Sequence, residues 1–136
     1  MKGLEAARRM LRMAERNLRL VKAVVDNTVI DDSLVGFDVQ QAMEKSLKAW
    51  LAAVGAEYPF SHDLGLLLDR LRREGQKVES FRKLAAYSLF AVQMRYDDFG
   101  ESEAATEGMD RPTVLQDARA LFDHVARVIQ SAESRS

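Results

Sequence analysis

Apolar residues recur along this chain at alternating steps of three and four positions, which is the period of an amphipathic helix. The first series covers about six turns of helix and comprises Leu4, Ala7, Leu11, Ala14, Leu18, Val21 and Val25. Asp26-Asn27 and the β-branched residues that follow, through Ile30, end this series. No stretch alternates with a period of two, so the pattern predicts helices and no sheet.

Two further helices are expected before the middle of the chain. The second begins near Asp31-Asp32-Ser33, whose side chains can accept hydrogen bonds from the free N-terminal amides, and runs to Val54 before Gly55 stops it. Ser61 can cap a third helix, which carries four leucines and which Gly75 closes. The short segment between them is a connection.

The same pattern predicts two helices in the second half. A fourth apolar series runs from Phe81 to Phe99, and an acidic loop of about residues 100–111 follows it. Pro112 suits the first turn of a fifth helix, in which Thr113 and Gln116 have the spacing of a capping box. The expected fold is all-α: one domain over residues 1–136, an up-and-down antiparallel bundle of about five helices.

Polar side chains interrupt the apolar face of the second helix. At about 100° per residue, its apolar positions fill one contiguous arc of the helical wheel, and they are Phe37, Met43, Leu47, Trp50, Leu51 and Val54. Gln40 and Glu44 fall inside that arc, and Gln41 and Lys48 lie on its edge. With Lys45, these residues are named the polar seam below. Buried polar groups have to be paired, so the seam indicates a network, a specific interface or a site.

The fourth helix contains a similar anomaly at Arg95. Counting by three and four from Phe81 leads to this arginine, one turn before Phe99. A buried arginine needs a carboxylate, and Glu44 has the matching need, so a Glu44–Arg95 contact between adjacent helices is expected. The alternatives are a nearby aspartate, Asp97 or Asp98, or an arginine that simply extends to water.

Composition limits the chemistry available to the chain. Among 136 residues there are no cysteines and two histidines, so disulfides, thiolate catalysis and cysteine-based zinc sites are excluded and a histidine-rich metal site is not expected. We expect no metal and no cofactor. No apolar run approaches the roughly 20 residues of a membrane span, and arginines interrupt the N-terminal region where a signal peptide would be apolar. A cytoplasmic protein without a membrane partner is expected.

Charge is balanced overall, at a net −1, but unevenly distributed. One basic cluster lies in the first 22 residues and consists of Lys2, Arg8, Arg9, Arg12, Arg16, Arg19 and Lys22. A second consists of Arg70, Arg72, Arg73, Lys77, Arg82 and Lys83. The simple interpretation is that these are solvated faces with intramolecular pairing. The alternative is a basic groove for RNA or for an acidic partner.

Three blocks of sequence together resemble the HEPN domain (higher eukaryotes and prokaryotes nucleotide-binding), over roughly residues 4–130. They are Phe37-x-x-Gln40-Gln41-Ala42-x-Glu44-Lys45-x-Leu47-Lys48-Ala49, then His62-Asp63-Leu64, then Arg95-Tyr96. The resemblance implies an up-and-down helical bundle that forms a homodimer. It also implies a minimal nucleotidyltransferase as partner, in a pair of the toxin–antitoxin type, and nucleotide or RNA as ligand, with no DNA expected.

Many HEPN proteins are metal-independent ribonucleases with an arginine followed, after four to six residues, by a histidine. Histidine can move a proton near neutral pH, and arginine can hold the scissile phosphate. Here Arg95 is present, but the window after it holds Gly100, Glu101 and Ser102. The expected function is therefore binding without the ribonuclease dyad, and the question whether the chain is an enzyme stays open.

The resemblance implies a site in which the polar seam is closed by Arg95 and Tyr96 and flanked by His62 and Asp63. His62 can alternatively cap the third helix or pack beside aromatic neighbours. A second hypothesis is an endoribonuclease in which Tyr96, His62 or a carboxylate replaces the missing histidine. A third is a structural adaptor, with the seam serving only the specificity of the bundle. Arg119 and His124 match the bare spacing too, but they lie about 140° apart on a helix.

Overall fold

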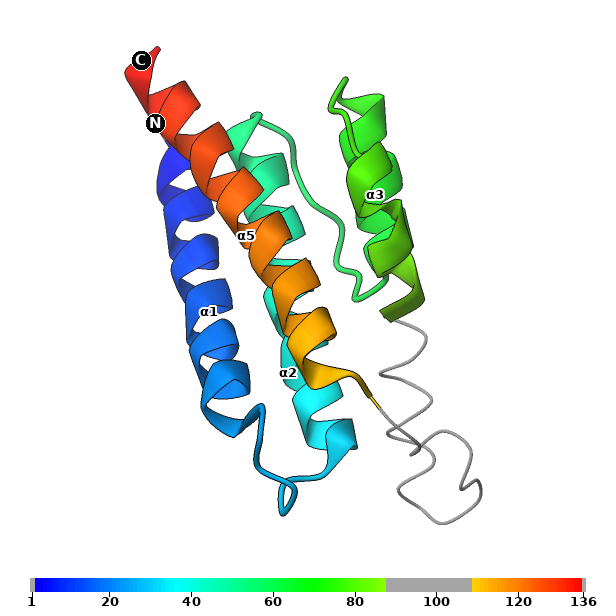
Figure 1. Cartoon of the computed structure of the whole chain (residues 1–136). Coiled ribbons are helices and arrows are strands. Elements are labelled where there is room, and N and C mark those ends of the chain that lie inside the picture. The colour runs from blue at the N-terminus through cyan, green and yellow to red at the C-terminus, as the bar shows by residue number, and fades with distance from the viewer. Residues whose placement is uncertain (1, 88–108, 136) are drawn as a thin grey trace.

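The computed structural model describes residues 2–87 and 109–135, and these residues are helical or connecting, with no strand among them. The expected all-α bundle is confirmed. In order, the elements are α1 (Lys2–Val24), α2 (Asp32–Ala53), α3 (Leu64–Arg73), the 3₁₀-helix η1 (Glu79–Leu84) and α5 (Arg111–Ser134). α1, α2 and α5 run side by side, and α3 stands on the side of α2 away from α1 (Figure 1). None of the described helices is long and apolar enough to span a membrane.

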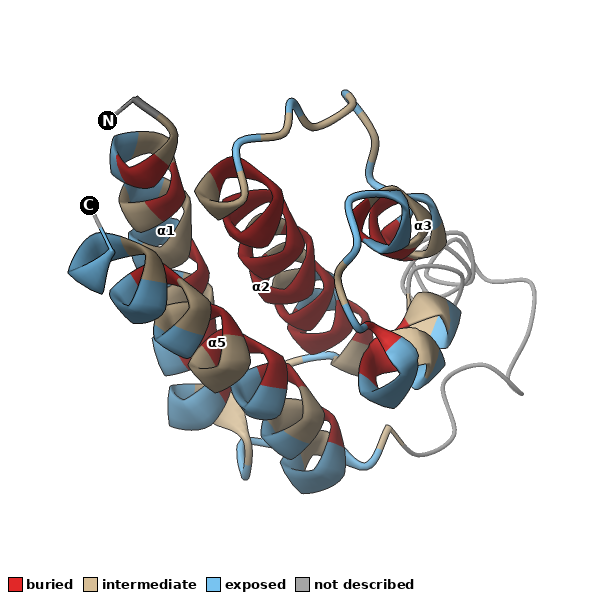
Figure 2. Ribbon diagram, turned by 90° about the horizontal axis from the view of Figure 1, so that it is seen from above, coloured by how far each residue is buried: buried red, intermediate tan, exposed pale blue. Residues whose placement is uncertain are grey.

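The second helix is the centre of the core. α2 packs against α1, α3 and α5, and 15 of its 22 residues are buried, so almost its whole circumference is covered (Figure 2). Close approach to α1 requires a small residue at Gly3, because a Cβ there would lie 2.8 Å from the carbonyl oxygen of Ala52. On a helix buried to this extent, a polar side chain is costly unless it is paired within the protein.

Two of the predicted N-terminal caps are wrong. α3 is capped by Asp63, whose Oδ1 accepts the N–H of Gly65 at 2.9 Å, whereas Ser61 accepts the N–H of Asp63. α5 is capped by Asp110, which accepts both the N–H and the hydroxyl of Thr113. In both cases an aspartate is the cap where a hydroxyl residue was expected, and a carboxylate is also favoured by the helix dipole.

The expected cap of α2 is wrong in a different way. Asp31 occupies the N-cap position, but its side chain makes no capping hydrogen bond. The carboxylate of Asp32 instead accepts Arg111 Nε at 2.8 Å, and Ser33 Oγ is buried without a hydrogen-bond partner. The side chain of Asp32, which was expected to cap the helix, forms a long-range ion pair instead.

The C-terminal ends agree with the sequence. Gly55 and Gly75 have φ values of +81° and +84°, the left-handed conformation in which glycine has no steric penalty. After α2, the N–H of Ala56 donates to the carbonyl of Leu51 at 2.9 Å and Gly55 donates to Ala52 at 3.1 Å, which is a Schellman motif. Each glycine therefore ends a helix, as predicted.

Arg111 joins the start of α5 to the connection between α1 and α2. Its guanidinium donates to Asp32 and also to the carbonyl oxygens of Val24 and Asn27 at 2.8 Å and of Ile30 at 2.5 Å. The carbonyls of Asn27 and Ile30 thereby gain a donor, and the carbonyl of Val24 accepts Arg111 in addition to the N–H of Asn27. The Arg111 side chain thus holds the loop that connects α1 to α2.

The predicted fourth helix begins as a 3₁₀-helix and not as an α-helix. Phe81 lies in the 3₁₀-helix η1, and residues 85–87 continue as α-helix. The remainder of that segment, with Arg95 and Tyr96, lies outside the described residues, as does nearly all of the expected acidic loop.

Candidate functional site

The carboxylate of Glu44 is the centre of the polar seam. It is buried on α2, where Lys48 Nζ lies 3.0 Å from Oε2 and Gln40 Nε2 lies 3.2 Å from Oε1. The three residues are spaced by four, so they lie one above another on the same helix face. Two of the hydrogen bonds of Glu44 are therefore made within α2.

The third partner of Glu44 comes from outside the helix. His62, on the connection 54–63, places Nδ1 2.9 Å from Glu44 Oε1. Gln40 Nε2 also donates to the backbone carbonyl of His62 at 2.8 Å, and Gln41 donates to Gln40 Oε1 at 3.0 Å. Both the ring and the backbone of His62 are thus held by α2.

Burial and hydrogen bonding act in opposite directions on Glu44. Burial by itself would raise the pKa of this carboxyl group, but hydrogen bonds from Lys48, His62 and Gln40, with the charge of Lys48, lower the pKa below its usual value. Glu44 is ionised at neutral pH. Its charge is balanced by Lys48, whose side chain is only 11% exposed.

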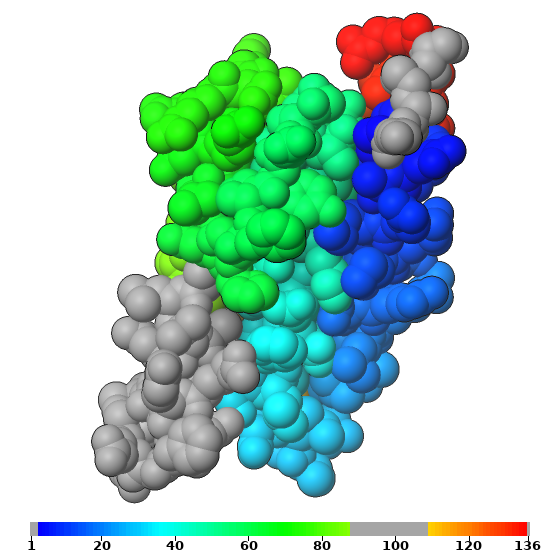
Figure 3. Space-filling view, turned by 180° about the vertical axis from the view of Figure 1, so that it is seen from behind, coloured from blue at the N-terminus to red at the C-terminus, as the bar shows by residue number. Residues whose placement is uncertain are grey.

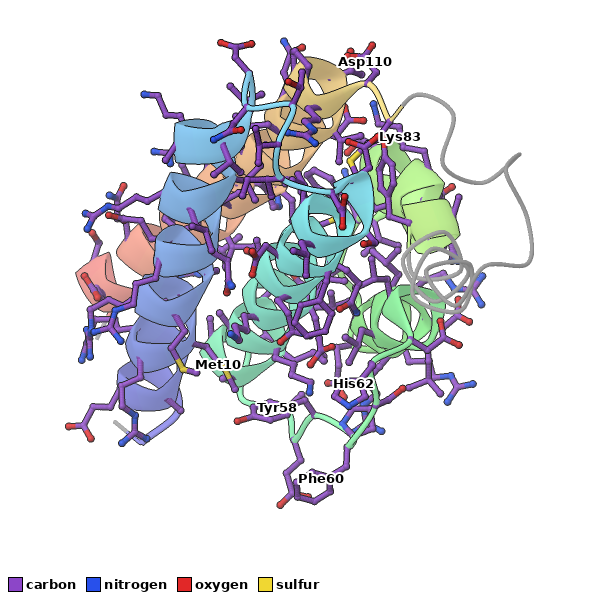
Figure 4. The ribbon with its side chains drawn as sticks, turned by 90° about the horizontal axis from the view of Figure 1, so that it is seen from below. Met10, Tyr58, Phe60, His62, Lys83 and Asp110 are labelled. Carbon is purple, nitrogen blue, oxygen red and sulfur yellow. The ribbon has the colours of Figure 1, made fainter. Side chains whose placement is uncertain are left out.

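His62 is the part of this network that solvent can reach. Its side chain is 83% exposed although Glu44 beneath it is buried. Tyr58, Phe60 and His62 project from the connection on the same side of the molecule (Figure 4), and the ring of Phe60 is fully exposed. Lys48 Nζ lies 5.7 Å from the centroid of the Tyr58 ring, which joins this residue to the seam. A histidine oriented by a carboxylate can donate or accept a proton, or bind an anion.

The remaining predicted site residues have separate roles. Lys45 donates to Asn17 Oδ1 at 3.0 Å, and Asn17 donates to Asp38, so Lys45 belongs to the contact between α1 and α2. Asp63 is the cap of α3. The predicted contact of Glu44 with Arg95 involves a residue outside the described part of the chain, so it stays a prediction.

Sequence reasoning missed that Glu44 is paired with Gln40 and Lys48 of its own helix. The signal was present in the i, i+4 spacing of Gln40, Glu44 and Lys48, which favours contacts along one helix over a contact with a neighbouring helix. The contribution of Tyr58 had no such signal, because a residue in a connection has no periodic position.

The second histidine lies in an aromatic cluster away from the seam. The His124 ring centroid is 4.7 Å from that of Trp50 and 5.1 Å from that of Phe81, and Trp50 Nε1 donates to Gln76. Burial lowers the pKa of His124, and the charge of Arg127 lowers it further. His124 is a packing residue here.

Arg119 does not share this environment. It forms an exposed ion pair with Asp123 and lies over the ring of Phe122, at 4.9 Å from its centroid. The Arg119 and His124 side chains therefore have different partners, as their angular separation on the helix predicts.

A groove of about 720 Å³ runs beside the His62 segment, between the connection and α3. It is lined by Glu57, Tyr58, Pro59, Asp63, Gly65, Leu66, Asp69, Arg70 and Arg73. Asp69 is paired with Arg82 at 2.9 Å, and Arg70 lies 3.4 Å from Glu74, so much of the charge here is already matched. Within residues 2–87 and 109–135, no cluster of three or more metal-ligating side chains occurs.

The chain matches a known protein family. A family model described as "HEPN domain" matches residues 7–135, nearly the whole chain. No curated protein and no solved structure matches the chain.

Proposed function

Because the chain belongs to the HEPN domain family, we propose that it is the helical partner of a minimal nucleotidyltransferase, in a pair of the toxin–antitoxin type. In this proposal it forms a homodimer and binds nucleotide or RNA without the arginine–histidine ribonuclease dyad. The absence of the dyad is supported by the sequence, because neither histidine follows Arg95 after four to six residues. His62 precedes it, and His124 packs on Trp50 and Phe81.

The observation that carries ligand binding is the exposed imidazole of His62 above a buried, ionised Glu44. Gln40, Glu44 and Lys48 are buried and bonded to one another, so in this proposal they support the site and do not contact the ligand. His62 contacts a phosphate or a base edge, with Tyr58 beside it. A fixed imidazole binds more tightly than a mobile one, because less rotational freedom is lost on binding.

Binding is tested with a labelled single-stranded RNA and with ATP as probes. We expect His62→Ala to weaken the affinity for the bound probe about tenfold, the effect of losing one hydrogen bond to a charged group. Arg119→Ala removes an exposed, paired side chain elsewhere and is the matched control, with unchanged affinity. Equal affinity of the wild type and His62→Ala would reject His62 as the contact residue.

The partner is tested by purifying the tagged chain from its own cells and identifying what accompanies it. The proposal requires a minimal nucleotidyltransferase in stoichiometric amount. A chain that purifies without one, from cells that express both genes, contradicts the pairing. If the seam served only bundle stability, as an adaptor would need, Glu44→Gln and Arg95→Met would lower stability and leave partner binding intact.

A second candidate function, an endoribonuclease, is favoured by the 2.9 Å contact between Glu44 and His62 Nδ1. In such a reaction His62 Nε2 accepts the proton of the ribose 2′-hydroxyl, and the 2′-oxygen forms a bond to phosphorus. The bond from phosphorus to the 5′-oxygen breaks, and the leaving oxygen takes a proton from water. The products are a 2′,3′-cyclic phosphate and a 5′-hydroxyl.

Incubation of the purified chain with structured RNA, with and without a chelator, separates the two candidates. Cleavage that persists with chelator and is lost in His62→Ala supports the endoribonuclease. Cleavage abolished by Arg95→Ala also overturns the non-catalytic proposal. No cleavage with or without divalent metal rejects the endoribonuclease.

A further inference from the structure

Three exposed arginines form a stripe along the outward face of α1. Arg9, Arg12 and Arg16 lie within about 60° of one another around the helix axis and extend over about 10 Å along it. All three side chains are exposed. They are named the arginine stripe.

Ion pairing distinguishes the stripe from the arginines beside it. Arg8 pairs with Glu133 at 2.5 Å, and Arg19 pairs with Glu15. None of the ion pairs formed among the described residues includes a member of the stripe. α1 holds two carboxylates, Glu5 and Glu15, and Glu15 is already engaged. The positive charge of the stripe is therefore not matched by an ion pair within the described residues.

We propose that the arginine stripe binds the phosphate backbone of RNA, an inference that rests on the proposed RNA binding and names the surface responsible. Guanidinium groups bind phosphate oxygens in a bidentate manner, and arginine is well suited to nucleic-acid recognition for that reason. A straight row of cations fits a chain of regularly repeated phosphates better than it fits irregularly spaced carboxylates of a protein. The contact is to the backbone, so it positions the RNA without reading its sequence.

The neighbours of the stripe suit the same partner. Met13 and Leu20 lie beside the arginines on this face and are 42% and 49% exposed, so they can pack against sugars or bases. α1 and the connection 54–63 also appear on the same face of the molecule (Figure 3). A strand anchored on α1 can continue across this face towards His62.

The second basic cluster is a weaker candidate for the same role. Three of its cations are paired, Arg82 with Asp69, Arg70 with Glu74 and Lys83 with Asp117. Carboxylates also line the adjacent groove. Its exposed members Arg72, Arg73 and Lys77 provide a matched control, because they are three cations on another surface.

The experiment measures the affinity of the full chain for a labelled single-stranded RNA as a function of salt concentration. Each phosphate contact contributes about 0.7 to the slope of log affinity against log salt for single strands. We expect the triple variant Arg9→Gln, Arg12→Gln, Arg16→Gln to reduce that slope by about two and to bind more weakly. The control Arg72→Gln, Arg73→Gln, Lys77→Gln changes the net charge equally and should keep the wild-type slope. Circular dichroism checks that both variants retain their helices.

The alternative outcomes are distinguishable. An equal loss in both triple variants would indicate a general charge effect and would overturn the assignment to α1. Wild-type binding by the stripe variant would overturn it as well, while leaving the proposed RNA binding intact. A wild-type chain that binds no RNA would reject the proposed RNA binding itself. If the stripe variant instead loses only the nucleotidyltransferase partner, the stripe is a protein interface and the RNA assignment is wrong.

Discussion

At the scale of single residues, Glu44 shows how one carboxyl group can be buried and still ionised. Lys48, Gln40 and His62 each bond to it, and together they lower its pKa against the effect of burial. Removing the carboxylate would leave Lys48 nearly buried without its counter-charge. A buried ion pair broken on one side costs more than the pair contributes in net stability.

Glu44→Gln is expected to lower the free energy of unfolding at neutral pH by about 3 kcal/mol. Since the folded-state pKa lies below the ordinary 4.5, the stabilisation by Glu44 is present above that pH and is lost as pH falls through the folded-state pKa. The difference between wild type and variant should therefore shrink in acid. Urea denaturation measures the free energy of unfolding of both proteins. The control is Glu15→Gln, which removes an exposed ion pair with Arg19 and should cost less than about 1 kcal/mol. Equal losses in the two variants would contradict the role of Glu44.

His124 makes stability depend on pH for a different reason from Glu44, because here burial itself lowers the pKa. Its pKa is lowered by burial and by Arg127, so the unfolded chain binds a proton at this residue more readily than the folded chain. Stability should fall as pH decreases below about 6.5, and His124→Phe should remove that decline while keeping the ring contacts with Trp50 and Phe81. Thermal unfolding at mildly alkaline and mildly acidic pH tests this. His62→Gln is the control, and it should retain the decline attributed to His124.

At the scale of elements, two connections are held by polar side chains that come from helices. The Gln40 amide holds the backbone of His62, and the connection 54–63 is thereby attached to α2. Arg111 attaches the connection between α1 and α2 to the start of α5 in the same manner. In each connection a polar side chain from a helix donates to backbone carbonyls of the connection.

Arg111→Met is expected to lower the free energy of unfolding by about 3 kcal/mol, because several hydrogen bonds from a charged donor are lost together and Asp32 loses its partner. Hydrogen exchange should rise first in residues 25–31, ahead of the helices. Arg119→Met removes an exposed i, i+4 pair with Asp123 and should cost under about 1 kcal/mol. Unchanged exchange in the connection would show that Arg111 does not hold it.

At the scale of the whole molecule, α2 is in contact with α1, α3 and α5, so its packing joins the bundle into one unit. Large apolar side chains nevertheless stay exposed in the described part of the chain, among them Val29, Leu34 and Phe60. Scattered exposed apolar residues occur on most protein surfaces, and only a contiguous patch of them marks an interface. The proposed homodimer is therefore tested directly.

Light scattering on the isolated chain should give twice the 15.3 kDa chain mass if the proposed homodimer forms. Leu34→Glu places a charge at an exposed apolar position of α2 and should shift the mass towards the monomer if that end of α2 is in the interface. The control is Leu66→Glu, which places the same charge at an exposed apolar position of α3, away from that end of α2. A monomeric wild type at all concentrations would reject the homodimer, whatever the variants do.

The sequence by itself determined α1, α2, α3 and α5, and the residues at which α2 and α3 end. The three-and-four spacing of apolar residues and the glycines at 55 and 75 are local signals, and each acts within a turn or two of the chain. The sequence also indicated that the polar groups of the seam had to be paired, since Gln40 and Glu44 fall within an apolar arc of α2. The family followed from the same residues, and its match covers residues 7–135.

Only the tertiary structure decided which groups pair with which. Glu44 meets His62, 18 residues away in the chain, and Asp32 meets Arg111, 79 residues away. Such contacts depend on how helices and connections pack, and a helical wheel contains no information about the neighbouring segment. The caps of α3 and α5 are local contacts by contrast, made by Asp63 and Asp110 to amides two or three residues away. Packing did decide which side chain of the network around Glu44 solvent reaches, and that side chain is His62.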